Sequence, residues 1–575
     1  MTRTRALLAL AGITAIGGAL RFYNLGWGAP YYHFHMDEHY VFAGADLLRV
    51  SMRDAALSGK FFMYGPVPMY ILNGVRWVYE AVSHPVVLSV HQDQITYMVM
   101  GRAISAAFGT ATIPMAYAIA ARLAGRPAGL LAAAFLAFSV LHIRDSHFFS
   151  VDISMTFFCM LTWLALMRMA ERGTIRSGVA TGVAFAAALT CKYTAVFMAV
   201  PIALAHLFSP LRPPSLWSLS AWGRWALRGL VPVVTSVITF FVIDPMVWRY
   251  WDKFLFDVRT QITEPHSGAT APIWAAHFVD IGSPRLYWFT NLLWWGMGPM
   301  LEIVSIAGVV WLLTRRSKAA LLAASVPIAY FVVAGSTQAP FIRYAIPFIA
   351  VLSVAAGVFC ADLLTRPRLR AAGGVLTAVT LATTAIYAAA YMNIFRQPDS
   401  RVAAARFLRQ ALPSGAKVLV EPSQNTPPMG SYFFATDFNR DYVVWGPRQE
   451  RLDFVQLYGL DTYVHLYDRR FPLEEKRNYI ASKVAQADWI VIDDTYLQYY
   501  SHLPDSVYGP VKQYYRDLFE GRLGFKLEKT FKVYPSLFGW EINDDSAEFT
   551  FRYFDHPGVF VFKRVPAATP PSPAT

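Results

Sequence analysis

Long apolar stretches separated by short polar loops recur through the first two thirds of this chain and constrain its fold most strongly. Of the 575 residues, 55% are hydrophobic and only 15% are charged, whereas soluble domains usually carry about 25% charged residues. The stretches predict an α-helical polytopic membrane protein with about eleven transmembrane helices. They lie near residues 6–23, 97–120, 128–142, 153–170, 178–190, 194–209, 229–243, 289–313, 319–334, 344–364 and 371–393.

Basic residues are concentrated in alternate loops. By the positive-inside rule these loops face the cytoplasm, so an odd number of helices places the C-terminal segment outside. The same rule explains the net charge of +13 without a nucleic-acid partner. The Ala- and Arg-rich composition favours a bacterial plasma membrane. The basic loops contain Arg3, Arg5, Arg122, Arg126, Arg172, Arg176, Arg212, Arg224, Arg228, Arg315, Arg316, Lys318, Arg366, Arg368 and Arg370.

Two outer loops are unusually long for a membrane bundle, at about 24–96 and 244–288. Long loops of this kind are usually functional. We therefore assign residues 1–395 to a transmembrane module that includes both loops.

The composition changes after this module. Lysine becomes frequent, and strand-like runs occur at 417–420, 489–492 and 559–562. These features predict a soluble α/β domain over residues 396–565, on the outer side of the membrane. Residues 566–575 are rich in proline and predict a disordered tail.

The adjacent carboxylates Asp37 and Glu38 follow the first apolar stretch. Such a pair is common in polar loops and means little alone. The predicted topology, however, places several other ionisable and aromatic residues at the same membrane surface, and ionisable groups at such helix ends mark functional sites. They include His142, Arg144, Asp145, His147, Asp152, Lys192, Tyr193, Arg343 and Tyr344.

The order of these motifs is informative. Arg21-Phe-Tyr-Asn-Leu-Gly followed by Asp37-Glu38-x-Tyr40 resembles the first-loop motif of the GT-C membrane glycosyltransferases, nearest to the protein O-mannosyltransferase and lipid A aminoarabinose transferase type. The resemblance covers about residues 1–395. Further matching segments are Tyr64-Gly-Pro66-Val-Pro68-Met-Tyr70, Gly101-Arg102 to Gly109, His142 to Asp152, Lys192-Tyr-Thr194 and Arg343-Tyr-x-x-Pro347.

The resemblance implies transfer of a sugar from a polyprenyl-phosphate donor to a hydroxyl of a protein, lipid or polysaccharide. A phosphate is already a good leaving group, whereas the attacking hydroxyl needs a base. The family motif assigns that base to Asp37, with inversion at the sugar. Glu38 orients the acceptor, holds a cation or pairs with an arginine. Asp152 supports the site or pairs with Arg144.

Cations are expected on the phosphate side of such a site. Lys192 and Arg343 are the main candidates for stabilising the departing phosphate, and Arg102 and Arg21 are secondary ones. The alternative is that these side chains extend to the membrane interface. The residues expected to line the substrate pocket are Tyr40, Tyr64, His142, His147, Tyr193 and Tyr344.

No cofactor is required by this chemistry. The alternative is a divalent cation held by His266 with Glu38 or Glu264, although the chain has no tight metal-ligand spacing there. Near the C-terminus, Asp555-His556 invites a catalytic interpretation, but an ordinary turn before the next strand is the preferred explanation.

Two other functions are compatible with the sequence. A transporter or flippase for a lipid-linked sugar would explain the charged residues and the helix count. The long outer loops, the soluble domain and the lack of inverted repeats favour a transferase instead. A non-catalytic scaffold for glycan assembly would recognise glycans through its outer domain.

Overall fold

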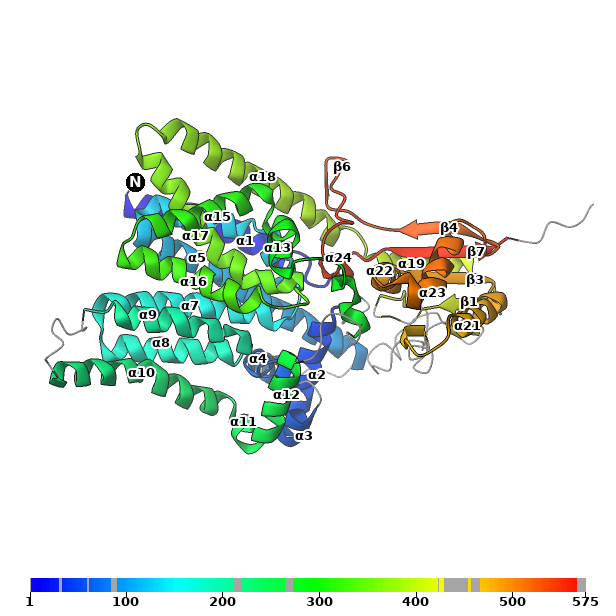
Figure 1. Ribbon diagram of the computed structural model, residues 1–575, viewed down its shortest axis with the longest axis horizontal. Helices are drawn as coiled ribbons and strands as arrows, with labels where there is room; N and C mark the ends of the chain where they lie inside the picture. The colour runs from blue at the N-terminus through cyan, green and yellow to red at the C-terminus, as the bar shows by residue number, and fades with distance from the viewer. Residues whose placement is uncertain are drawn as a thin grey trace, which may run out of the picture.

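The apolar stretches form a bundle of long helices that makes up one side of the molecule (Figure 1). In this computed structural model, residues 2–29, 34–58, 61–83, 90–210, 219–263, 272–421, 423, 425–428, 453–456 and 466–565 are described. The bundle contains α1 (Arg3–Phe22), α5 (Val90–Ala137), α6 (Val140–Asp145), α7 (Val151–Arg172), α8 (Ile175–Leu189), η2 (Tyr193–Met198), α9 (Ala199–Leu207), α10 (Leu219–Ile243), α15 (Pro299–Thr314), α16 (Lys318–Ala334), η5 (Ile342–Tyr344), α17 (Ala345–Thr365) and α18 (Arg370–Arg396).

The length and composition of these helices fit a bilayer. Among the described residues, six helices are long and apolar enough to cross a membrane, and a bent pair that includes α15 would be a seventh. The segments α8, η2–α9 and α16 are shorter apolar helices. Every predicted stretch falls on helical segments, and α5 contains two stretches separated by a break at Ala124 and Gly125. The predicted helical membrane class is confirmed, and the chain is an integral membrane protein.

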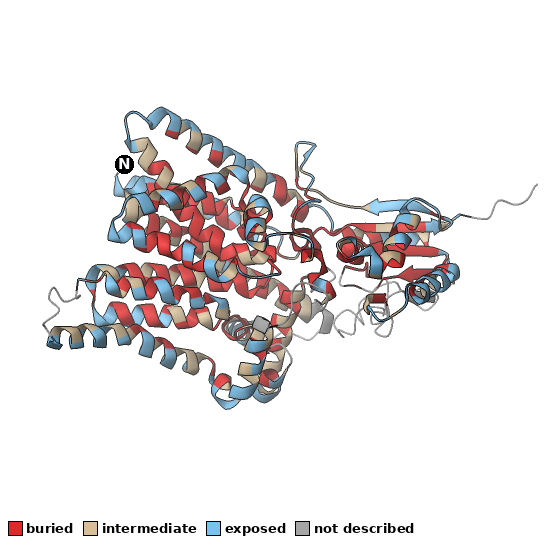
Figure 2. Ribbon diagram, viewed as in Figure 1, coloured by how far each residue is buried: buried red, intermediate tan, exposed pale blue. Residues whose placement is uncertain are grey.

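The helix α17 lies at the centre of the bundle, whereas α10 lies at its edge (Figure 2). In the apolar window of Ile342–Thr365, 89% of residues are buried, against 11% in α10. A methyl group at Gly357 of α17 would lie 2.6 Å from the backbone nitrogen of Ala132. Glycine therefore permits the close backbone approach that packs helices in lipid. This central position fixes η5, which leads directly into α17.

Short helices occupy the connections after α1 and after α10. The two groups pack on each other. Phe62 of the first group and Phe254 of the second meet edge to face, with ring centroids 5.8 Å apart. The first group is α2 (Met36–Val50), α3 (Met52–Leu57), η1 (Phe61–Met63) and α4 (Val67–Ser83). The second group is α11 (Pro245–Arg249), α12 (Trp251–Thr263), η3 (Ile273–Phe278), α13 (Pro284–Tyr287), η4 (Trp288–Leu293) and α14 (Trp294–Met297).

The C-terminal part contains a five-stranded sheet with the order β2-β1-β3-β7-β4. The strands β2, β1 and β3 are parallel, and β7 is antiparallel to both β3 and β4. The predicted strand runs fall on β1, β3 and β7, and the predicted tail 566–575 lies outside the described residues. The elements are α19 (Ser400–Ala411), β1 (Lys417–Val420), β2 (Asp453–Gln456), α21 (Leu473–Gln486), β3 (Trp489–Asp493), α22 (Asp494–Ser501), α23 (Asp505–Phe519), β4 (Phe525–Phe531), β5 (Ser536–Leu537), β6 (Trp540–Glu541), α24 (Thr550–Tyr553) and β7 (Val559–Arg564).

Buried charged groups join this C-terminal region to the bundle. Arg144, at the end of α6, donates to the carbonyl oxygen of Thr550 at 2.7 Å and pairs with Asp555 at 3.3 Å. The hydroxyl of Tyr391 in α18 donates to the same carboxylate at 2.6 Å. Removing one partner of a buried ion pair is strongly destabilising. These contacts therefore hold the sheet region against the helices.

His556 extends this network between two carboxylates. Its Nε2 atom lies 2.8 Å from Asp544, and its Nδ1 atom lies 2.7 Å from Asp555. Burial alone would lower the pKa of His556, but the negative charges of Asp555 and Asp544 raise it to about 9. The imidazolium is therefore charged at neutral pH. These contacts give Asp555-His556 a structural role in the interface.

The raised pKa of His556 predicts a pH-dependent stability. Because the pKa rises from 6.5 to about 9 on folding, its stabilising contribution is complete below the lower value and is lost as the pH rises through the higher one. We expect the melting temperature of the detergent-solubilised protein to fall over that range. His556→Gln should cost about 3–5 kcal/mol at neutral pH, because two buried carboxylates lose their cation. Identical pH dependence of wild type and variant in thermal unfolding would contradict this account.

Candidate active site

Asp37 lies in the first turn of α2, between side chains that come from distant segments. Its Oδ1 atom accepts a hydrogen bond from the Tyr64 hydroxyl at 2.7 Å. Its Oδ2 atom lies 3.2 Å from a guanidinium nitrogen of Arg343. Asp37 is only 5% exposed. The first turn of a helix also favours negative charge, because its backbone N–H groups are free.

Arg343 lowers the pKa of Asp37. Burial alone would raise the pKa of this carboxyl group, but the charge of Arg343 opposes burial most strongly, followed by His35 and the hydrogen bond from Tyr64. Together they hold the pKa at about 2. Burial lowers the pKa of His35 itself to about 3, so His35 is neutral at pH values near 7. Among the contacts that lower the pKa of Asp37, the charge of Arg343 has the largest effect.

A second ion pair lies next to the first, across the ring of Tyr344. Lys192 Nζ is 2.8 Å from Asp152 Oδ1 and 5.0 Å from the centroid of the Tyr344 ring. The guanidinium carbon of Arg343 lies 5.6 Å from the same centroid. The side chains of Lys192 and Arg343 are 16% and 20% exposed, so both cations remain accessible. The structure thus brings two predicted carboxylates and two predicted cations together.

A glycine allows Tyr64 to reach this cluster. The Gly65 N–H donates to the carbonyl oxygen of Cys191 at 3.1 Å. A methyl group at Gly65 would lie 1.9 Å from the carbonyl oxygen of Thr190, so only glycine permits this approach. The Tyr64-Gly65 motif therefore runs directly beside the segment that leads to Lys192.

Glu38 forms a separate and fully buried ion pair with Arg102. Its two oxygens accept hydrogen bonds from Arg102 Nε and a terminal nitrogen, both at 2.9 Å. One oxygen also accepts from the backbone N–H of Phe149 at 3.1 Å. The other terminal nitrogen of Arg102 donates to the carbonyl oxygens of Leu25 and Trp27. Among the roles predicted for Glu38, this bidentate geometry favours pairing with an arginine.

Arg21 and the two predicted histidines lie within the bundle. Arg21 donates to the carbonyl oxygens of Leu136 and Ala137 at 3.0 and 3.1 Å, and a guanidinium nitrogen lies 3.0 Å from His142 Nδ1. These bonds satisfy carbonyl groups at the end of α5. His147 is held by the backbone carbonyls of Ile143 and Tyr23 and stacks on Phe395.

The remaining aromatic candidates, Tyr40 and Tyr193, contact different groups of aromatic rings. Tyr40 stacks on Tyr64, with ring centroids 5.9 Å apart, so both border the cluster. Tyr193 instead contacts the rings of Phe240 and Phe254 at 6.3 and 5.4 Å. It thus joins η2 to α10 and α12 rather than stacking on the first-loop tyrosines.

The predicted cation site at Glu264 and His266 lies outside the described residues. Across the described ranges, no group of three or more histidine, cysteine, aspartate or glutamate residues could hold a metal ion. Glu38, the other proposed partner of His266, is engaged by Arg102. Asp152 pairs with Lys192 rather than with Arg144.

Glu548 supports the segment that carries Arg343. No sequence pattern predicts this role. The backbone N–H of Ile342 donates to Glu548 Oε2 at 2.9 Å. The other oxygen bonds His277 Nε2 at 2.8 Å, and the Glu548 N–H donates to Asn291 at 2.7 Å. Ile342 and Glu548 are 206 residues apart, and no local motif signals so distant a contact.

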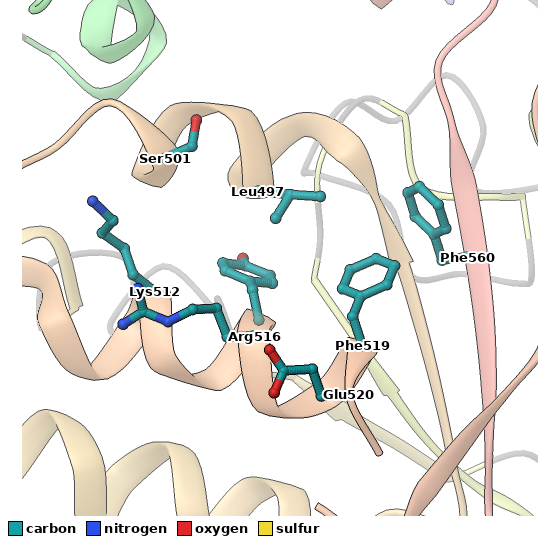
Figure 3. Close-up of a pocket in the computed structure, with 8 residues that line it drawn as sticks. Leu497, Ser501, Lys512, Arg516, Phe519, Glu520 and Phe560 are labelled. Carbon is teal, nitrogen blue, oxygen red and sulfur yellow. The ribbon is translucent and has the colours of Figure 1, made fainter. Parts of the chain in front are cut away.

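A cavity of about 500 Å³ lies in the C-terminal region, apart from this cluster. Figure 3 shows aromatic and aliphatic side chains converging there from α22, α23 and β7. None of the predicted site residues lines it, so it does not belong to the candidate active site. The lining residues include Leu497, Lys512, Tyr515, Arg516, Phe519 and Phe560.

Residues 93–239 match the model of a family described as dolichyl-phosphate-mannose-protein mannosyltransferase. The match bears out the resemblance to the protein O-mannosyltransferase type over this segment, which contains Arg102, Asp152 and Lys192. No curated protein matches the chain.

Several solved structures have a similar chain path. ArnT from Cupriavidus metallidurans bound to undecaprenyl phosphate has 15% identity and a TM-score of 0.44, with 100% of each chain covered. The Archaeoglobus fulgidus oligosaccharyltransferase in its apo form has 13% identity and a TM-score of 0.49, covering 94% of this chain and 76% of that one. The S. cerevisiae Pmt1-Pmt2 complex has 18% identity and a TM-score of 0.33, covering 43% and 35%.

The buried Glu38–Arg102 pair predicts a large structural effect of substitution. Glu38→Gln should destabilise the protein by about 3–5 kcal/mol, because the Arg102 charge remains buried without an anion. The matched control is Glu80→Gln, which removes the partly exposed partner of Arg49 and should cost about 1 kcal/mol or less. Thermal unfolding in detergent measures both changes. Equal stability of the two variants would contradict a structural role for Glu38.

Proposed function

We propose that this protein transfers a sugar from a polyprenyl-phosphate donor to the hydroxyl group of an acceptor. The observation that carries the proposal is the Asp37–Arg343 ion pair with Lys192 beside it across one aromatic ring. It supplies an anion that can take a proton and two accessible cations that can receive a phosphate. The description of the matching family, which names a lipid-phosphate-linked mannose, supports the same donor chemistry.

The reaction is a single displacement. Asp37 accepts the proton of the acceptor hydroxyl while that oxygen attacks the anomeric carbon. The bond between the anomeric carbon and the phosphate oxygen breaks, and its electron pair leaves with the polyprenyl phosphate. Arg343 and Lys192 stabilise the charge that develops on this phosphate. Attack opposite the leaving group inverts the anomeric configuration.

Arg343 couples donor binding to the strength of the base. While it pairs with Asp37, it holds the pKa of that carboxyl at about 2, which makes Asp37 a weak base. A donor phosphate competes for the same guanidinium group. When Arg343 turns toward the phosphate, burial again dominates and the pKa of Asp37 rises. The base is therefore strengthened when the donor is in place.

The charge distribution supports an outward-facing site. The bundle ends rich in arginine, such as the α7–α8 connection, lie away from α2 and the sheet region (Figure 1). The positive-inside rule assigns those ends to the cytoplasm. Asp37 and the C-terminal region then face the outside of a bacterial plasma membrane.

Asp37→Asn should abolish transfer while leaving the protein folded. Loss of a general base reduces rates by about 10²–10⁴-fold, and the amide keeps the shape of the side chain. Cells lacking the protein are complemented with each variant, and their glycoproteins and envelope glycans are compared by mass spectrometry. The control is Asp54→Asn, an exposed aspartate in α3, which should restore the missing glycan. Restoration by Asp37→Asn would exclude Asp37 as the base.

Arg343→Gln should change the pH profile as well as the rate. Without the guanidinium, the pKa of Asp37 is expected to move from about 2 to its ordinary 3.8 or above, because burial then dominates. The acid limb of the kcat/KM profile reports ionisation of the base. This limb should therefore move to higher pH by the same amount as the pKa of Asp37. Initial rates with the donor and acceptor identified by that glycan comparison measure this shift. An unchanged acid limb would show that Arg343 does not control the base.

A further inference from the structure

Four arginines line one cavity at the end of the bundle away from Asp37. The cavity has a volume of about 630 Å³, is open to the surface and is bordered by the end of α7, the start of α8 and Arg228 of α10. Its lining residues are Arg168, Arg172, Thr174, Ile175, Arg176, Ser177, Ala180 and Arg228. Half of them are therefore cationic, and the lining includes no carboxylate.

Local sequence features bring these charges together. Gly173 adopts a left-handed conformation with φ of 61° and ends α7, and Thr174 immediately caps α8. Arg168 and Arg172 are four residues apart, so they share one face of α7. Close packing of α8 on α10, where a methyl at Gly178 would lie 3.0 Å from Val231, brings Arg228 to the same cavity.

Among the residues that the structure describes, no carboxylate pairs with any of the four arginines. All four are exposed, and within the described ranges none forms an ion pair. By contrast, Arg315 at this end of the bundle pairs with Asp362 at 3.0 Å. Like charges that converge on one cavity repel one another unless an anion lies between them. The positive-inside rule explains their side of the membrane but not this convergence.

The surroundings of the cavity favour a lipid over a soluble anion. On α10, Leu227 and Leu230 flank Arg228 and are 66% and 52% exposed, and Val234 one turn farther along is 51% exposed. On α8, Val179 is 39% exposed beside Ala180. Apolar side chains at the level of a bilayer can contact acyl chains while the arginines hold a phosphate.

We infer that this cavity binds the phosphate headgroup of an anionic phospholipid from the adjacent leaflet. The site is independent of the proposed transferase chemistry, because it lies at the opposite end of the bundle. The arginines contribute charge and hydrogen-bond donors to the phosphate oxygens. The exposed apolar residues of α10 and α8 contact the acyl chains.

Native mass spectrometry of the full-length protein in zwitterionic detergent tests this inference. Phosphatidylglycerol and phosphatidylcholine with the same acyl chains are titrated separately. The cavity variant is Arg168→Gln/Arg172→Gln/Arg176→Gln/Arg228→Gln. The control variant, Arg3→Gln/Arg5→Gln/Arg368→Gln/Arg370→Gln, removes the same charge from exposed positions at other bundle termini. If the larger variants fail to fold, Arg172→Gln/Arg228→Gln and Arg5→Gln/Arg370→Gln replace them.

Wild type and control should bind phosphatidylglycerol equally and more tightly than phosphatidylcholine. The cavity variant should bind it at least about tenfold more weakly, since each cation near a phosphate contributes an increment of affinity. Equal weakening in both variants, or no weakening, would overturn the site. A parallel titration with inorganic phosphate distinguishes the source. Saturable phosphate binding that is lost in the cavity variant, without any preference for phosphatidylglycerol, would overturn the lipid assignment.

Discussion

The ion pair between Asp37 and Arg343 is the interaction on which the candidate active site depends. Asp37 comes from the connection after α1, and Arg343 comes from the turn before α17, so the pair forms only when the bundle is complete. Residues Ile342–Thr365 are the most buried of the candidate spans in the described chain, at 89% of their apolar window. The backbone that carries the cation therefore lies at the start of a well-packed helix. Its side chain can then exchange Asp37 for a donor phosphate while the backbone stays in place.

The C-terminal region also holds the segment that carries Arg343. Glu548 accepts the N–H of Ile342, next to Arg343, and Arg144, Tyr391 and His556 converge on Asp555. Burying so many charges is costly unless each one is paired. The near-complete pairing explains why the sheet region and the bundle meet in one defined geometry. The region contributes to the site by holding the backbone segment that carries Arg343.

The sequence predicts those features that depend on local patterns. Apolar length locates the helices, the first-loop motif locates Asp37, and the short segments around Lys192 and Arg343 locate the cations. It does not predict how Glu38 is used, because its choice of Arg102 depends on packing between α2 and α5. The role of Glu548 is equally hidden, since its partners Ile342 and His277 are distant in the chain and lie on short irregular turns. Pairing specificity among buried charges is a tertiary property.

The basic side chains at the two ends of the bundle differ in whether they are paired with carboxylates. Beside α2, Arg343 and Lys192 each pair with a carboxylate, so an incoming phosphate must compete with Asp37 or Asp152. At the far end, the four arginines of the cavity form no ion pair with any residue in the described part of the chain. Paired cations bind weakly but change the protonation chemistry of the carboxylate they leave. Unpaired cations retain an anion without altering any other group. The first arrangement suits a substrate that must depart, and the second suits a lipid that stays.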